Sequence, residues 1–497
     1  MDSEEESSSL IKSPQEKIKR ENVKNGYQNG DVKTRKLDPV NFGEASIETI
    51  ANPNEKSETD FTFFNAPRSK KILLLSLGMV NFCAMACFSL LSPFYPKEAA
   101  EKNVTQTVIG LVFGSFEFTI FITAPLYGNY ITRIGSKFMF IAGVGVCGVC
   151  TILFGFLDNI PDESTFVTMC FLTRGIEALG ASAYITASFA IISHAYPNHV
   201  STVIGILETF SGVGMMVGPA IGSALYVVGG FGMPFYVLGG ILIVCGMICP
   251  LVMPKIDDKK QTLSRSIFYL LKSPLCVVVC FITVCGTIGL GFLEPVLADR
   301  LEQLDLSTIL IGIMFLINSA TYAIGAPVWG WIGDTKGVLK GLIIFGNIAT
   351  GFGYMLLGPS PFLVFYPFEV WAQILALVLV GVFCGAAIIP TYNVLVEGAV
   401  KQLGMEDDFE THGLIAGIYN SCWSLGAFIG PMVAGALVQE FEFPWSCTAC
   451  GGLFIFAGLV MLVYVIVERY TLCCPTKPLK AGYEKMIDET LCESVEV

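Results

Sequence analysis

Twelve long apolar runs constrain this sequence more than any other feature, because each approaches the roughly 20 residues that a helix needs to cross a membrane. Hydrophobic residues make up 53% of the 497-residue chain and charged residues 14%, a balance that a soluble globular protein does not show. Isolated runs of this length satisfy their backbone hydrogen bonds in lipid only as helices. The sequence therefore predicts an all-α polytopic membrane protein with twelve transmembrane helices, with approximate edges at 71–95, 108–131, 138–157, 165–190, 203–229, 234–253, 275–297, 308–332, 339–358, 369–392, 413–438 and 445–467.

The second half of the apolar region repeats the first. Ala-Pro-x-aromatic-Gly at 124–128 recurs at 326–330, and "GILETFSGVGMMVGPAIGSAL" from Gly205 matches "GIYNSCWSLGAFIGPMVAGAL" from Gly417. Two six-helix pseudo-symmetric halves are predicted, with a substrate site between them near the midplane. The expected parts are a disordered N-terminal tail (1–66), an N-terminal half (67–253), a central loop (254–274), a C-terminal half (275–468) and a C-terminal tail (469–497).

Lysine and arginine predict the orientation of the spans. With both termini cytoplasmic, ten of these residues fall in the inner loops next to the spans and three in the outer loops. The tails and the central loop are then cytoplasmic. Asn103, in the sequon "NVT", falls on the outer or luminal side and is a glycosylation candidate, although its loop is short.

Charged residues inside the spans mark candidate functional sites, because one at the bilayer centre costs about 2.5–3.5 kcal/mol on insertion scales. They are Glu117, Arg174, Glu177, Glu208 and Glu294. Arg174 and Glu177 are three residues apart and either neutralise each other or contact substrate. Glu294 either binds substrate or is hydrated near the interface. Four acids against one base predict a cavity that favours a cation.

Glu117 and Glu208 have no charged partner on their own helices and are predicted to bind substrate or protons. In the eleventh span, Tyr419, Asn420 and Trp423 lie together. The two aromatic rings are four residues apart and either hold an ammonium group or pack in the core. The three histidines, His194, His199 and His412, lie in loops or at span ends and are poor proton-relay candidates.

The loop motifs resemble the major facilitator superfamily. Its cytoplasmic loop signature, between the second and third helices of each half, is matched by Gly128, Arg133, Gly135 and Lys137 and by Gly330, Asp334, Lys336 and Gly337. The antiporter signature of the fifth helix is matched by Gly205, Gly214, Gly218, Pro219 and Gly222, and Arg174 resembles the arginine of the fourth helix. The resemblance implies alternating access, exchange against protons, and lipid-facing spans 3, 6, 9 and 12. Thr132 stands where an Asp is usual, which predicts a latch that depends more on Asp334.

Within the superfamily, the sequence resembles the vesicular amine transporter branch. The resemblance rests on "PFYP" at 93–96, on the paired Gly-Pro signatures and on short signals in the tails, described below. It is strongest to the polyamine-transporting members of that branch. The monoamine members carry acidic residues at two positions that match Ala84 and Asn420 here. Both acids are therefore missing from this sequence. Glu208 is the repeat mate of Asn420 by the 212-residue shift. The resemblance therefore implies polyamines such as spermidine and spermine as substrates.

The tails carry short address signals. The acidic dileucine form and the Tyr-x-x-bulky form, both read by clathrin adaptors, are matched by Glu6, Leu10 and Ile11 and by Tyr483 and Met486. A vesicular or endolysosomal membrane is expected, with the plasma membrane as the alternative.

The predicted function is a proton-coupled antiporter that moves organic cations into acidic vesicles by alternating access. The alternatives are a plasma-membrane drug or organic-cation antiporter, and a non-transporting receptor or scaffold. No enzyme motif, metal cluster, cofactor site or nucleic-acid partner is predicted from the residues.

Overall fold

A computed structural model describes residues 67–91, 95–252, 266–306, 308–363 and 366–473. These residues form helices joined by short turns, and eleven of the helices are long and apolar enough to cross a membrane. The main helices are α1 (Arg68–Ser89), α2 (Tyr95–Glu101), α3 (Gln106–Ile134), α4 (Ser136–Phe154), α5 (Glu163–Ala195), α6 (Val200–Gly229), α7 (Gly232–Val252), α8 (Pro274–Glu302), α9 (Thr308–Lys336), α10 (Leu339–Leu357), α11 (Val370–Glu397) and α12 (Phe409–Cys473).

The last long helix, α12, contains two of the twelve predicted spans. Its 65 residues would extend about 98 Å if straight, roughly three times the thickness of the hydrocarbon core. Its backbone leaves the helical region at Glu442, where φ is 61° and ψ is 163°. The predicted interruption between 438 and 445 is therefore a kink at Glu442, where two helices meet.

The first span is shorter than predicted. Helix α1 ends at Ser89, and a separate short helix, α2, begins at Tyr95, so the last two residues of "PFYP" belong to a new helix. Pro96 is the second residue of α2, where a missing backbone N–H is tolerated and the fixed φ suits a helix start. The expectation that the first span runs to residue 95 was wrong, because the proline at 96 lies at the start of a new helix and does not mark the end of α1.

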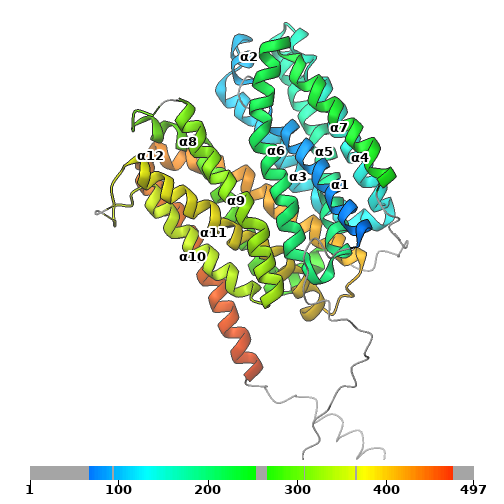
Figure 1. Ribbon diagram of the computed structural model, residues 1–497, viewed down its shortest axis with the longest axis vertical. Coiled ribbons are helices and arrows are strands. Elements are labelled where there is room, and N and C mark those ends of the chain that lie inside the picture. Colours follow the sequence, from blue (N-terminus) through cyan, green and yellow to red (C-terminus); the bar gives the residue numbers. More distant parts are fainter. Residues whose placement is uncertain (1–66, 92–94, 253–265, 307, 364–365, 474–497) are drawn as a thin grey trace, which may run out of the picture. The chain divides into compact units, whose positions relative to one another are not determined.

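Helix contacts repeat in the same order as the sequence. The contact of α1 with α6 is matched by that of α8 with α12, and α4 with α5 and α7 by α10 with α11 and α12. Between the two sets, α3 packs against α12 and α6 packs against α9 (Figure 1). We call these two contacts the α3–α12 seam and the α6–α9 seam, and they are equivalent under the repeat.

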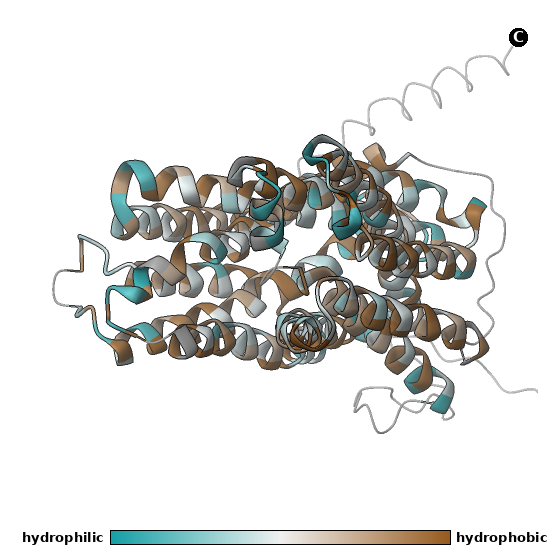
Figure 2. Cartoon of the chain, turned by 90° about the horizontal axis from the view of Figure 1, so that it is seen from above, coloured by the Kyte–Doolittle hydropathy of each residue, from teal (hydrophilic) through white to brown (hydrophobic). Residues whose placement is uncertain are grey.

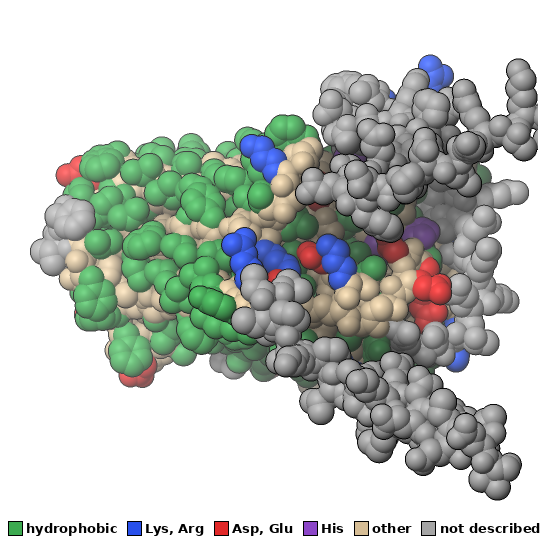
Figure 3. Space-filling model, turned by 90° about the horizontal axis from the view of Figure 1, so that it is seen from below, with side chains coloured by type: hydrophobic (Ala, Val, Ile, Leu, Met, Phe, Trp, Pro, Cys, Tyr) green, Lys and Arg blue, Asp and Glu red, His purple; other side chains and the backbone are tan. Residues whose placement is uncertain are grey.

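Helices α4, α7 and α10, which carry no charged residue beyond their first turn, present apolar side chains outward. Phe138 and Val149 on α4, Ile248 on α7 and Phe352 on α10 are about half exposed or more. Hydrophobic residues dominate the helices in Figure 2 and much of the face in Figure 3, where Lys and Arg side chains lie mainly near the middle of the view and acidic ones are scattered. This exposure suits contact with lipid, because apolar side chains on the outside of a soluble protein would be unfavourable.

Glycines end α3 and α9 at the same place in each repeat. Gly135 follows α3 with φ of 92°, and Gly337 follows α9 with φ of 63°. Other residues rarely adopt this left-handed backbone region, so both positions favour glycine. We call the membrane end where these turns lie the signature end.

Candidate functional site

The repeated Ala-Pro-x-aromatic-Gly motif lies at both seams between the halves. At the α6–α9 seam, a Cβ added to Gly205 would lie 2.6 Å from the backbone oxygen of Ala326, and one added to Gly330 would strike the backbone of Ser201. The hydroxyl of Thr209 also crosses this seam, donating to the backbone oxygen of Ala323 at 2.7 Å. Backbone therefore meets backbone directly between α6 and α9.

The α3–α12 seam is built in the same way. A Cβ added to Gly128 would lie 2.6 Å from the backbone oxygen of Gly413, and one added to Gly417 would lie 2.7 Å from that of Ala124. At the signature end, the α3–α12 seam and the α6–α9 seam thus bring the two halves into direct contact.

Asp334 joins the halves by hydrogen bonds. Its carboxylate accepts from the backbone nitrogens of Ser201 at 3.3 Å and Thr202 at 2.7 Å, and from the Thr202 hydroxyl at 2.7 Å. The side-chain nitrogen of Asn393 on α11 donates to it at 2.9 Å. An acceptor at the start of a helix satisfies N–H groups that have no partner within the helix. Asp334 of α9 therefore caps α6 from the other half.

The matching position in the first repeat makes no such bond. Thr132 is 4% exposed, and its hydroxyl oxygen has no hydrogen-bond partner among the described residues. Helix α12 is instead capped from its own segment, by Asp408, which accepts from the backbone nitrogen of Thr411 at 2.9 Å. The two seams are alike in backbone packing and different in charge.

The other loop-signature side chains do not gather at one point. Arg133 and Lys336 are exposed, with the Arg133 guanidinium 5.7 Å from the ring of Tyr130, and Lys137 is half-buried. Lys340, which follows the second copy, contacts Glu468 at 2.8 Å and Glu397 at 3.6 Å. The sequence did not single out these two glutamates, because they come from α12 and α11, far along the chain.

Arg174 and Glu177 form a buried ion pair. The Nη1 of Arg174 lies 2.7 Å from Glu177 Oε2, and the arginine side chain is fully buried. Its guanidinium lies 4.7 Å from the centre of the Phe116 ring and 5.3 Å from that of Phe88. Glu177 also accepts from the hydroxyl of Thr151 at 3.1 Å. The charge of Arg174 is therefore already compensated and cannot offset the remaining acids fully.

Glu117 and Glu294 come from opposite halves. Glu117 on α3 is half-buried, accepts a hydrogen bond from the Ser424 hydroxyl of α12 and lies in the electrostatic range of Arg174. Glu294 on α8 is exposed, and Glu117 acts electrostatically on it. The structure thus brings two of the predicted acids near each other across the halves.

Glu208 stands apart from that pair. It is half-buried on α6, and its electrostatic neighbours include Tyr322 of α9 and Tyr419 of α12. The hydroxyl of Tyr322 is buried and has no hydrogen-bond partner among the described residues. Tyr322 carries no sequence signal of its own, since one tyrosine in an apolar run is ordinary.

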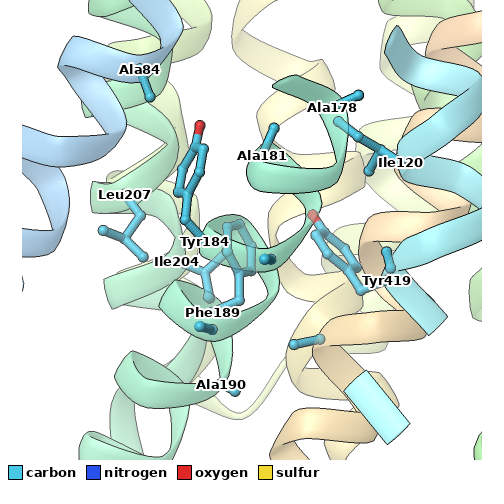
Figure 4. Close-up of a cluster of buried hydrophobic side chains, with 14 of the residues drawn as sticks. Ala84, Ile120, Ala178, Ala181, Tyr184, Phe189, Ala190, Ile204, Leu207 and Tyr419 are labelled. Atoms are coloured by element: carbon cyan, nitrogen blue, oxygen red, sulfur yellow. The ribbon is translucent and has the colours of Figure 1, made fainter. Parts of the chain in front are cut away.

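The aromatic residues of the eleventh span pack mainly against other aromatics. Tyr419 is 1% exposed and its ring lies 5.7 Å from Phe189 of α5, beside which Figure 4 shows it, and 6.1 Å from Trp423. Trp423 is half-buried. Asn420 is 5% exposed and donates to the Thr186 hydroxyl of α5 at 3.5 Å. These contacts favour packing between halves for Tyr419, and leave Trp423 more accessible.

The glycines of the antiporter signature serve two different contacts. A Cβ on Gly214 or Gly218 would strike α1, at the backbone of Phe82 or the hydroxyl of Ser89, whereas Gly205 faces α9. Gly222 is buried and Pro219 is half-buried within α6. Close approach of helix backbones is what small residues in membrane helices permit.

Two histidines meet between the halves, which the sequence did not indicate. The ring of His194 on α5 lies 5.6 Å from that of His412 on α12, and beside them Ser193 and Tyr392 share a hydrogen bond of 3.1 Å. Their positions at span ends were foreseen, but their contact was not, because it depends on how the halves dock.

Some predicted residues lie elsewhere. Asn103 is exposed between helices with φ of 65°, and its glycosylation stays a prediction. The tail signals at Glu6, Leu10, Ile11, Tyr483 and Met486 lie outside the described residues.

Comparison with known proteins identifies the architecture. The family model described as Major Facilitator Superfamily matches residues 77–397 and 279–473. A solved structure, the human organic anion transporter MFSD10 (TETRAN), covers 80% of this chain and all of its own at a TM-score of 0.63 and 15% identity. That similarity concerns the fold.

Sequence relatives are closer. The chain is 38% identical to the human MFS-type transporter SLC18B1 over 403 residues, covering 81% of this chain and 88% of that protein. It is 25% identical to the human synaptic vesicular amine transporter, with 72% and 66% covered. A probable vesicular acetylcholine transporter-A of Danio rerio is 26% identical, with 69% and 65% covered.

Proposed function

The chain belongs to the major facilitator superfamily and is a multi-pass membrane transporter, and on that premise we propose that it exchanges protons for organic cations, specifically polyamines such as spermidine and spermine. The proposed membrane is that of an acidic vesicle, with the signature end toward the cytosol. Similarity to vesicular amine transporters supports this location. Clathrin adaptors remain proposed partners of the tails.

One observation carries the proposal: acids outnumber bases where the halves meet. Glu117, Glu208 and Glu294 come from three helices, whereas Arg174 is engaged by Glu177 at 2.7 Å. Carboxylates that are partly withdrawn from solvent and lack a basic partner within the described part of the chain, as Glu117 and Glu208 are, attract cations strongly. A polyamine, with several ammonium groups, can engage more than one of them.

The same carboxylates supply the coupling. In the acidic lumen, a proton on Glu208 or Glu117 removes the negative charge that holds the cation, so the cation is released there. Loss of the proton toward the cytosol restores the site. A ligand shifts the equilibrium between the two access states only through different affinity for each, and protonation provides that difference.

Uptake into proteoliposomes with an imposed inside-acid gradient tests the proposal. We expect spermidine uptake that stops when the gradient is collapsed, and we expect Glu208→Gln to abolish it. Glu302→Gln, an exposed acid at the end of α8, is the matched control and should transport normally. Uptake of an organic anion alone would overturn the charge argument, and equal uptake of many unrelated cations would favour a broad drug exporter.

A further inference from the structure

Two imidazoles from opposite halves lie against each other at the signature end. The rings of His194 on α5 and His412 on α12 are 5.6 Å apart at an angle of 67°. Phe409 of α12 packs on His194 at the same distance and at 90°. Histidine is the side chain whose charge ordinarily changes between about pH 5 and 8. A contact between halves that alternating access must break thus contains two groups that protons can charge.

One of the two imidazoles has a fixed partner for its charge. The Nε2 of His412 donates to Asp407 Oδ1 at 2.8 Å, and this bond holds the pKa of the Asp407 carboxyl below its usual range. Asp407 therefore stays ionised and compensates a proton on His412. The Nδ1 of His412 is buried and has no hydrogen-bond partner among the described residues.

The surroundings of the second imidazole, His194, compensate a positive charge less well. Among the residues that the structure describes, the charged groups that act on His194 are His412, Asp407 and Asp408. Asp407 is bonded to His412, and Asp408 accepts from the backbone nitrogen of Thr411 at 2.9 Å. On the α11 side, Tyr392 is hydrogen-bonded to Ser193. Among the described residues His412 forms an ion pair with Asp407 and His194 forms none, so a second positive charge, on His194, would face the first with no carboxylate at ion-pair distance.

We propose that the His194–His412 contact is proton-sensitive: the halves stay together at the signature end while at most one imidazole is charged, and part when both are. Two like charges this close repel in a site of low dielectric, and separation lets water hydrate each. This inference rests on the proposed function for its meaning, since it makes opening at that end depend on the proton concentration there.

Distances between the halves test it without measuring transport. Nitroxide-bearing amino acids at the exposed positions Phe138 and Val338, one in each half, leave the native cysteines unchanged. In lipid nanodiscs, pulsed electron paramagnetic resonance gives the open and closed populations. Going from about pH 7.5 to about pH 5.5, we expect the open-to-closed ratio to rise roughly tenfold in the unmodified protein.

Variants separate charge from packing. His194→Phe keeps an aromatic ring without charge and should stay closed at both pH values, and His412→Gln should lose most of the response. His199→Gln, the third histidine at this end, should respond like the unmodified protein. An equal response in all variants, which would assign the effect to Glu117, Glu208 or Glu294, overturns the inference, as does His194→Phe opening at neutral pH. Failed polyamine uptake with an intact histidine response would remove only the proposed function.

Discussion

The carboxylate of Asp334 on α9 lies 2.7 Å from both the backbone nitrogen and the hydroxyl of Thr202 on α6. One half thereby supplies the N-cap of a helix in the other. Caps contribute about 0.5–2 kcal/mol within one helix, and here the whole contribution is lost when the halves separate. In the alternating-access cycle proposed above, the cap therefore stabilises one access state relative to the other.

Removing the charge of Asp334 should disturb transport more than removing the hydroxyl of Thr132. We expect Asp334→Asn to slow uptake roughly tenfold, as loss of one to two kcal/mol from one state implies, and Thr132→Ala to change it less than about twofold. Initial uptake rates in proteoliposomes measure this. Equal effects would remove the idea of an asymmetric latch.

Adding one methyl group at either seam should hold the halves apart at the signature end. In Gly128→Ala and Gly330→Ala the new Cβ meets backbone of the other half, which cannot move aside as a flexible side chain can. Gly110→Ala and Gly312→Ala are matched controls, because nothing lies within 4 Å of either position. Interspin distances should lengthen only in the seam variants. If the control variants also lengthen, helix propensity and not contact is responsible.

The buried pair of Arg174 and Glu177 should depend on both partners. Arg174→Gln or Glu177→Gln leaves one buried charge without a partner, which costs about 3–5 kcal/mol. The double variant should recover much of that loss. Thermal unfolding of the purified protein, followed by a double-mutant cycle, gives the coupling. Additive losses would show that the two charges act separately.

Moving the carboxylate of Glu208 to its repeat mate should not restore function. Asn420 is 5% exposed and bonded to Thr186, whereas Glu208 is half-buried. We therefore expect Glu208→Asn with Asn420→Glu to transport no better than Glu208→Asn alone. Spermidine uptake decides, with surface expression as the control. Recovery would mean that the two positions face the same cavity.

The short helix α2 should give the protein a pH-dependent stability. Burial, together with a hydrogen bond to Asp158, raises the pKa of the Glu98 carboxyl above its ordinary value of 4.5. Nearby Glu101 raises it further and Lys102 opposes it. A raised folded pKa favours folding below the ordinary value, and this contribution disappears as pH rises through the folded value.

Glu98→Gln mimics the protonated carboxyl at every pH. Between about pH 4 and 7, we expect the melting temperature of the unmodified protein to fall relative to that of Glu98→Gln. Glu302→Gln should show no such difference. A gap between the curves that widens toward acid would reverse the sign and contradict the assignment.

The sequence predicted the helices well because apolar length and repeat spacing depend on local composition. It predicted the Arg174–Glu177 pair for the same reason, since three residues separate them on one helix. It missed the partner of Asp334, the histidine contact and the place of Tyr322, each of which joins residues more than a hundred positions apart. Docking of the halves fixes such contacts, and no local pattern encodes it. The early end of α1 was missed because proline can open a helix as readily as close one.

The two equivalent seams have a consequence for how a chain with two such halves can arise. Each half offers α3 or α9 to the other half and receives α12 or α6 in return, so each carries both surfaces of the contact. This is the property of an isologous interface, in which one patch is complementary to a copy of itself. A single six-helix unit with these surfaces could pair with its twin as a symmetric dimer. Fusion of the two copies would then let the two seams diverge, as the acidic Asp334 at one and the neutral Thr132 at the other have done.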